Sequence, residues 1–233
     1  MDGRVFDFQS LADCVEIMLA DAGANDDGLL TIDDNGTYAF ERVSFHSPMT
    51  SLTIIGTDGD DTLIVDFSGG NPIDFGGLTF EGGANGVLGD RLELVGGTFA
   101  TATYVATGPA SGTIDLDETG IDYTGLEPIL DTNDIDDRVF DFSSLADGVE
   151  IMLADAGAND DGLLTIDDNG TYAFDRVSFH HPMTSLTTIG TDGNATVISD
   201  FSGGNPNDSC GLPFDRGANG VVRARLQLQG LPL

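Results

Sequence analysis

The chain has no lysine and no tryptophan, and its aromatic residues amount to only 8% of 233 positions. All 8 basic residues are arginines, and they stand against 40 acidic residues, so the formal net charge is −32. A field of this sign repels phosphate backbones and anionic lipids, which argues against nucleic-acid binding and electrostatic membrane docking. The absence of lysine also excludes phosphate-binding loops of the Walker type and Schiff-base catalysis. Few aromatic platforms remain for stacking on sugars or bases.

Long apolar runs and a disulfide framework are missing as well. The apolar stretches, such as residues 63–65, have the length of a strand and fall far short of the roughly 20 residues of a membrane span, so we expect no membrane insertion. The first residues lack the basic start and apolar stretch of a secretory signal. Only Cys14 and Cys210 are available for a disulfide.

The chain repeats itself after 138 − 4 = 134 positions. Residues 4–50 and 138–184 share 43 identities in 47 positions, and residues 51–97 share 30 of 47 with residues 185–231. The first copy continues through residues 98–136, and the second has no such continuation. The sequence therefore predicts a complete repeat unit at 1–136 and a truncated unit at 137–233 with a divergent C-terminal tail. We expect the chain to be a fragment of a longer repetitive protein.

Period-two alternation and turn residues predict an all-β chain. Residues 30–33 and 37–40 flank Asp34-Asn35-Gly36, the signature of a tight hairpin. The further predicted strands are 15–19, 43–45, 52–55, 62–67, 78–80, 91–95, 101–106, 113–116 and 121–123.

Two architectures fit these strands. Leu52-Thr53-Ile54 and Leu78-Thr79-Phe80 lie 78 − 52 = 26 residues apart, and each leads through a Gly/Asp turn into another aliphatic strand. This spacing favours a parallel β-solenoid, similar to a β-helix, in which each repeat of the spacing is one turn. The hairpin signature favours the alternative, tandem antiparallel β-sandwich repeats.

The segment 56–64 (GTDGDDTLI) closely matches the nonapeptide G-G-x-G-x-D-x-apolar-x of calcium-binding β-rolls. Its glycines permit a tight corner, its acidic side chains can supply oxygen ligands, and Leu63 begins a buried strand. Looser versions occur at 22–29 and at 82–92, the latter with three inserted residues. The segment 22–29 recurs in the second repeat at 156–163. The candidate metal ligands are Asn25, Asp26, Asp27, Asp58, Asp60, Asp61, Asp90, Asn159, Asp160 and Asp161. In the second copy Ala195 stands where the first has Asp61.

On these motifs the chain resembles large exported bacterial repeat proteins with haemolysin-type (RTX-like) calcium-binding segments. The resemblance implies calcium as a cofactor, bound weakly at the Gly/Asp-rich turns, and an extracellular or cell-surface location. In that family the nonapeptides stand in tandem and share each ion, whereas here they are isolated.

Other interpretations of the acidic turns remain open. Asp, Asn and Gly are favoured in solvated turns without any metal. An EF-hand at 23–34 would place a glycine at the first ligand position and an aspartate at the last, between flanks that are not helical. His46, His180 and His181 lack a nearby cysteine that would complete a zinc site.

We expect a non-catalytic structural or adhesive segment of a secreted protein. Paired carboxylates such as Asp7, Asp66 and Asp74 could serve a β-helix polysaccharide-degrading enzyme, but they recur in both copies, and no arginine or aromatic cluster accompanies them to hold a sugar. An acidic spacer without ion sites is the alternative. The sequence names neither the cell-surface or matrix partner nor the oligomeric state.

Overall fold

The computed structural model describes residues 3–11, 14–23, 28–47, 50–73, 76–84, 88–155, 162–202, 214–215 and 225–229. These residues form two multi-stranded sheets with parallel and antiparallel pairs and contain no helix, which confirms the all-β prediction. Accordingly, none of the described segments is a helix that could span a membrane. The chain divides into two compact units (residues 1–98 with 118–133, and residues 99–117 with 134–233), which are described in turn.

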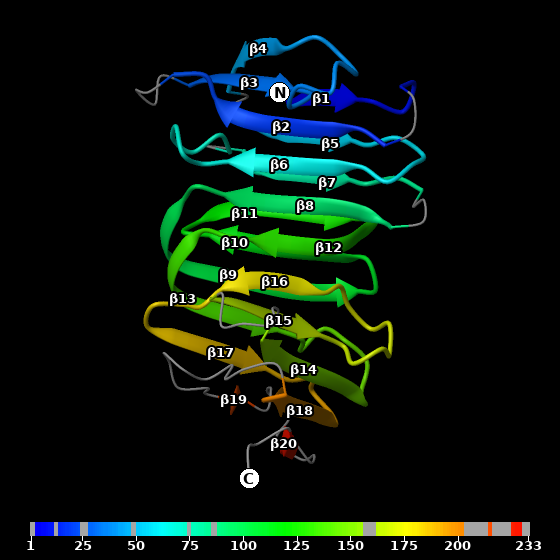
Figure 1. Ribbon diagram of the computed structural model, residues 1–233, viewed down its shortest axis with the longest axis vertical. Coiled ribbons are helices and arrows are strands. Elements are labelled where there is room, and N and C mark those ends of the chain that lie inside the picture. Colours follow the sequence, from blue (N-terminus) through cyan, green and yellow to red (C-terminus); the bar gives the residue numbers. More distant parts are fainter. Residues whose placement is uncertain are drawn as a thin grey trace. The chain divides into compact units, whose positions relative to one another are not determined.

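Unit 1 is built from two layers of parallel strands (Figure 1). Neighbours in the first layer are, in order, β1 (Arg4–Asp7), β5 (Leu52–Ile55), β7 (Leu78–Glu81) and β11 (Thr119–Thr124). Neighbours in the second layer are β2 (Glu16–Asp21), β6 (Thr62–Asp66), β8 (Asp90–Val95) and β12 (Leu126–Asp131).

The chain alternates between these layers, from β5 to β6, then to β7 and β8. Leu52 pairs in parallel with Leu78, so the residues 26 positions apart in the sequence are neighbours in space. In the other layer Leu63 pairs with Leu92. Alternate side chains are buried along β5 and β7, whereas β6 buries the three consecutive residues 63–65, and the centre holds aliphatic side chains together with Phe80.

An antiparallel excursion separates β2 from β5. Strand β2 pairs with β3 (Leu29–Asp33), and β3 pairs with β4 (Val43–His46). The prediction that residues 37–40 form the second hairpin strand is therefore wrong, while the predicted strand 43–45 is confirmed. Tyr38 has a φ of 62° and is 95% exposed. The Asp34 carboxylate accepts N–H groups of Gly36 and Phe40 at 3.1 and 3.3 Å, and these bonds hold residues 34–40 as a loop.

Unit 2 repeats this arrangement with a different start. Its first layer runs in the order β10 (Ser111–Leu116), β9 (Thr98–Gly108), β13 (Asp134–Asp141), β17 (Ser185–Ile189) and β19 (Phe214–Asp215). Its second layer runs β20 (Arg225–Gln229), β18 (Ala195–Asp200), β14 (Val149–Asp155), β15 (Leu163–Asp167) and β16 (Val177–His180).

The division between the units follows strand pairing rather than the sequence repeat alone. The antiparallel hairpin β9–β10 precedes the predicted boundary at 136/137, yet it belongs to unit 2 because β9 lies beside β13. The nine strands predicted in addition to the hairpin pair all occur, within a few residues at their ends. Strands β1 and β12 were not predicted, and no strand was predicted by range after residue 123, where β13 to β20 lie.

Candidate functional site: the acidic corner of unit 1

Four predicted ligands come together at one corner of unit 1. Asp58, Asp60 and Asp61 lie in the connection between β5 and β6, and Asp90 is the first residue of β8. The parallel register, which pairs Thr62 with Arg91, sets Asp61 beside Asp90. Asp61 is 1% exposed and Asp90 is fully buried, whereas Asp58 is exposed. Two carboxylates that sequence analysis placed in solvated turns or metal sites are thus inside the protein.

The Asp61 carboxylate is surrounded by hydrogen-bond donors of the chain itself. Its Oδ1 accepts the N–H of Val15, 46 residues earlier, at 2.7 Å and the hydroxyl of Thr57 at 2.9 Å. Its Oδ2 accepts the backbone N–H of Thr57. Val15 immediately precedes β2, so one side chain joins the start of β2, the corner loop and the start of β6. Hydrogen bonds from several donors to one buried carboxylate are strong and stabilise the local structure.

Asp90 repeats the same device one strand further along. Its Oδ1 accepts the backbone N–H of Asp61 at 2.8 Å, and the N–H of Arg91 in turn donates to the Asp61 carbonyl at 2.7 Å. The pKa of the Asp90 carboxyl is raised to about 6, mainly by burial; the charges of Asp61 and Asp60 also raise it, and the hydrogen bond from the Asp61 N–H lowers it. The corner therefore concentrates negative charge in a place that water reaches poorly.

Asp60 also bonds to the backbone. Its Oδ1 accepts the N–H groups of Leu88 and Gly89 at 3.0 and 2.8 Å, which ties the β5–β6 connection to the end of the β7–β8 connection. Hydrogen bonds of this kind consume the lone pairs that a cation would also use.

Two glycines let the strands approach these carboxylates. A Cβ on Gly56 would lie 2.4 Å from the Gly82 carbonyl oxygen and 2.5 Å from Asp61 Oδ2. A Cβ on Gly82 would lie 2.3 Å from Asp90 Oδ2. Here the glycines of the nonapeptide pattern are required because a side chain would collide with the buried acids. The same glycines would also be expected in a calcium-binding turn, so the pattern does not distinguish the two structures.

The second copy carries a different corner. Ala195, 3% exposed, occupies the position of Asp61, and Thr191 turns its hydroxyl to the carbonyl of Asn194 at 3.3 Å. Asn194 stands where the first copy has Asp60. The corner of unit 2 therefore has no carboxylate equivalent to Asp61.

The remaining predicted ligands, Asn25, Asp26, Asp27, Asn159, Asp160 and Asp161, lie outside the described residues. Within the part of the chain that the structure describes, no group of three or more His, Cys, Asp or Glu side chains has the arrangement of a metal site.

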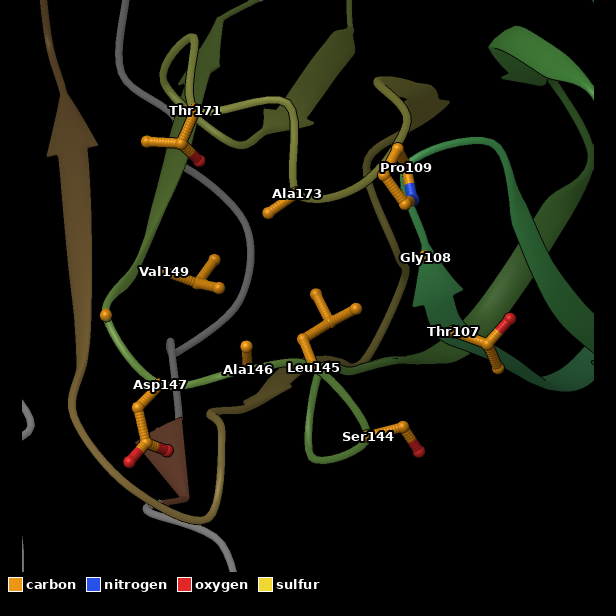
Figure 2. A pocket seen from close by; sticks show the side chains of 11 residues that line it. Thr107, Gly108, Pro109, Ser144, Leu145, Ala146, Asp147, Val149, Thr171 and Ala173 are labelled. Atoms are coloured by element: carbon orange, nitrogen blue, oxygen red, sulfur yellow. The ribbon is translucent and has the colours of Figure 1, made fainter.

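Unit 2 contains a cavity of about 380 Å³ (Figure 2). It is lined by the end of β9 and the following turn, by the connection from β13 to β14, and by the loop at Thr171 and Ala173. Leu145 and Val149 supply apolar walls, and Asp147 is the one ionisable residue among the 11 that line it. This lining contains no carboxylate pair of the kind that glycoside hydrolysis uses.

Comparison with family models, with curated proteins and with solved structures finds no match to this chain. The described residues show an all-β protein with an internal sequence repeat and, in unit 1, buried aspartates at the strand ends.

Proposed function

We propose that the chain is a non-catalytic structural repeat segment in which the corner aspartates hold successive strands in register. The observation that carries this proposal is the bonding of Asp61, whose buried carboxylate accepts N–H groups from Val15 and Thr57. Three neighbouring parallel strands, β2, β6 and β8, are joined at this corner by side-chain and backbone bonds of Asp61 and Asp90.

We further propose that each unit is a two-layered β-solenoid. Alternation of the chain between two parallel layers and the in-register pair of Leu52 with Leu78 support this architecture. Tandem antiparallel sandwiches would require antiparallel neighbours where β1, β5, β7 and β11 are parallel. The antiparallel strands β3 and β4 are then an excursion from one turn of the solenoid.

Calcium binding at the same corner is the second candidate function. The observation in its favour is the raised pKa of Asp90, to which Asp61 and Asp60 contribute, because a cation would relieve this repulsion. A site of this kind would be of the extracellular grade, with a dissociation constant of roughly 10⁻⁴–10⁻³ M. The resemblance to exported calcium-binding repeat proteins supports a cell-surface setting and a structural or adhesive role there.

Thermal unfolding followed by circular dichroism separates the two candidates. The full chain is melted in EDTA, in millimolar calcium, and in magnesium at equal ionic strength. If the aspartates have only a structural role, the wild type should have the same melting temperature in all three solutions, and Asp61→Ala should have a lower one in each of them. A calcium-selective rise that disappears in Asp60→Ala would favour the ion site instead. If Asp61→Ala melts like the wild type in EDTA, the structural proposal is wrong.

A further inference from the structure

The segment Arg-Val-Phe-Asp-Phe occurs twice, and the two copies differ in what covers them. In unit 2 this segment ends β13, which has β17 on one side and β9 on the other. In unit 1 it forms β1, which pairs with β5; among the described residues no strand lies on the other side of β1. Identical sequences thus present one occupied and one open sheet edge.

In unit 2 the hairpin β9–β10 covers the outer edge of β13, and Tyr104 makes the main side-chain contacts. The Tyr104 ring stacks on Phe140 with a centroid separation of 4.6 Å and an interplanar angle of 14°. Arg138 donates from Nη1 to the Tyr104 hydroxyl, and its guanidinium lies 5.9 Å from the centre of the Tyr104 ring. Arg138 is 0% and Phe140 1% exposed as a result.

In unit 1 the matching residues are open to solvent. Arg4 is exposed, Val5 is 64% exposed, and Phe6 is half-buried. The N–H groups of Arg4 and Phe8 donate to the carbonyls of Ser51 and Ile55, on the side of β5. Because N–H groups alternate in direction along a strand, those of Val5 and Asp7 face the open side.

The open edge already has the geometry of the covered one. The centroids of Phe6 and Phe45 are 4.9 Å apart with the rings tilted at 49°. The corresponding pair in unit 2, Phe140 and Phe179, is also 4.9 Å apart with a tilt of 45°.

The arginines agree in the same way. The guanidinium of Arg4 lies 5.3 Å from the centre of the Phe45 ring, and that of Arg138 lies 5.3 Å from the centre of the Phe179 ring. The edge of β1 is therefore preorganised for the hairpin, so docking would require little rearrangement.

We propose that the outer edge of β1 is a docking site for a hairpin with the sequence of β9–β10 supplied by another copy of the repeat. The inference rests on the proposed structural function, since it makes the repeat the unit of end-to-end assembly. Strand β9, the strand of the hairpin that would lie against β1, carries no charged residue, and the one acid of β10, Asp115, lies on the strand farther from β1. Its buried face would bring Ala102, Tyr104 and Ala106 to the edge of β1, and its backbone would occupy the free N–H groups.

Amide hydrogen exchange in the full chain tests the premise. The N–H groups of Val139 and Asp141 should exchange about 100-fold more slowly than those of Val5 and Asp7, because only the former face a neighbouring strand. Equal exchange at the two pairs would overturn the inference.

The docking itself is tested in an extended chain, in which residues 98–136 are joined directly before Gly3 so that the 136/137 junction is reproduced. Exchange at Val5 and Asp7 should then slow by about 100-fold, to the level of Val139 and Asp141. Replacing Tyr104→Ala in the added segment alone should restore fast exchange at Val5 and Asp7, while Val139 and Asp141 serve as the unchanged control. Arg4→Ala should have the same effect from the receptor side.

Three outcomes of these experiments count against the inference. One is fast exchange at Val5 and Asp7 in the extended chain while Val139 and Asp141 stay protected. Another is protection that persists in both Tyr104→Ala and Arg4→Ala. The third is concentration-dependent protection of β1 in the unextended chain, seen together with dimers in sedimentation, because the hairpin of each chain already covers its own β13. None of these readouts depends on Asp61, so the docking inference and the structural function can fail separately.

Discussion

Removal of the Asp61 carboxylate is the perturbation with the most definite expected size. Asp61→Ala leaves the buried N–H groups of Val15 and Thr57 without their acceptor. Hydrogen bonds to charged groups contribute about 1.5–3 kcal/mol each, and the loss of repulsion with Asp90 offsets part of this. We therefore expect the free energy of unfolding to fall by about 3–4 kcal/mol.

Urea denaturation measures this change. With a slope of about 2–3 kcal/mol per molar, the midpoint should move down by about 1–2 M. The urea midpoint of Asp61→Asn should lie between those of Asp61→Ala and the wild type, because the side-chain amide keeps one acceptor oxygen and places an NH₂ donor against the other N–H partner. Hydrogen exchange adds a local readout, since the Val15 N–H should lose its protection in Asp61→Ala.

Asp58→Ala provides the matched control from the same loop. Asp58 is exposed, so its removal should change the free energy of unfolding by no more than about 0.5 kcal/mol. A midpoint for Asp61→Ala within about 0.2 M of this control would refute the reasoning, because it would show that the buried bonds contribute nothing.

Three further predictions concern Asp90, Arg138 and Gly56, the last two each with a control substitution. The folded-state pKa of Asp90 is raised to about 6, so this carboxyl destabilises the fold progressively as pH rises from about 4 through 6. In parallel urea titrations, the stability advantage of Asp90→Asn over wild type should therefore grow by up to about 3 kcal/mol between pH 4 and pH 7. Arg138→Ala should lower the unfolding free energy by about 2–4 kcal/mol, and Arg4→Ala by less than about 1 kcal/mol, since only Arg138 is buried against Tyr104; equal losses in thermal melts would contradict this. Gly56→Ala should cost about 3 kcal/mol by calorimetry, whereas Gly120→Ala, which has open space at its Cβ, should cost less than about 1 kcal/mol.

Much of the fold is predictable from local patterns in the sequence. The alternation of Leu52 and Ile54 with polar residues predicts β5, and the 26-residue spacing predicts that Leu78 is the neighbour of Leu52. The loop at 37–40 also alternates apolar and polar residues, and the pattern predicts a strand there. Hydrogen bonds to Asp34 and the left-handed backbone of Tyr38 override this pattern, and neither can be inferred from periodicity.

The acidic corner shows a second limit of sequence analysis. The nonapeptide pattern predicts Asp61 as a metal ligand, which stays a prediction, and it contains no information on which donors surround the carboxylate. Val15 is 46 residues away, and its N–H reaches Asp61 only because β2 and β6 are parallel neighbours. Strands β1 and β13 share the segment Arg-Val-Phe-Asp, and both were missed for a related reason, because their parallel partners β5 and β17 are distant in the sequence.

The connections between the strands differ in length while the strands keep their pairing. The step from Leu52 to its partner Leu78 is 78 − 52 = 26 residues, and the step from Leu63 to Leu92 is 92 − 63 = 29 residues, so the connection between β7 and β8 absorbs the three extra residues. The step from Ile17 to Leu63 is 63 − 17 = 46 residues and contains a whole antiparallel excursion. A deletion of one residue within β6 would turn its inward side chains outward, whereas guest sequences inserted between β7 and β8 would leave every pair unchanged. The fold is therefore a scaffold that accepts new material at its corners, and its strand lengths set the limit on what can be altered.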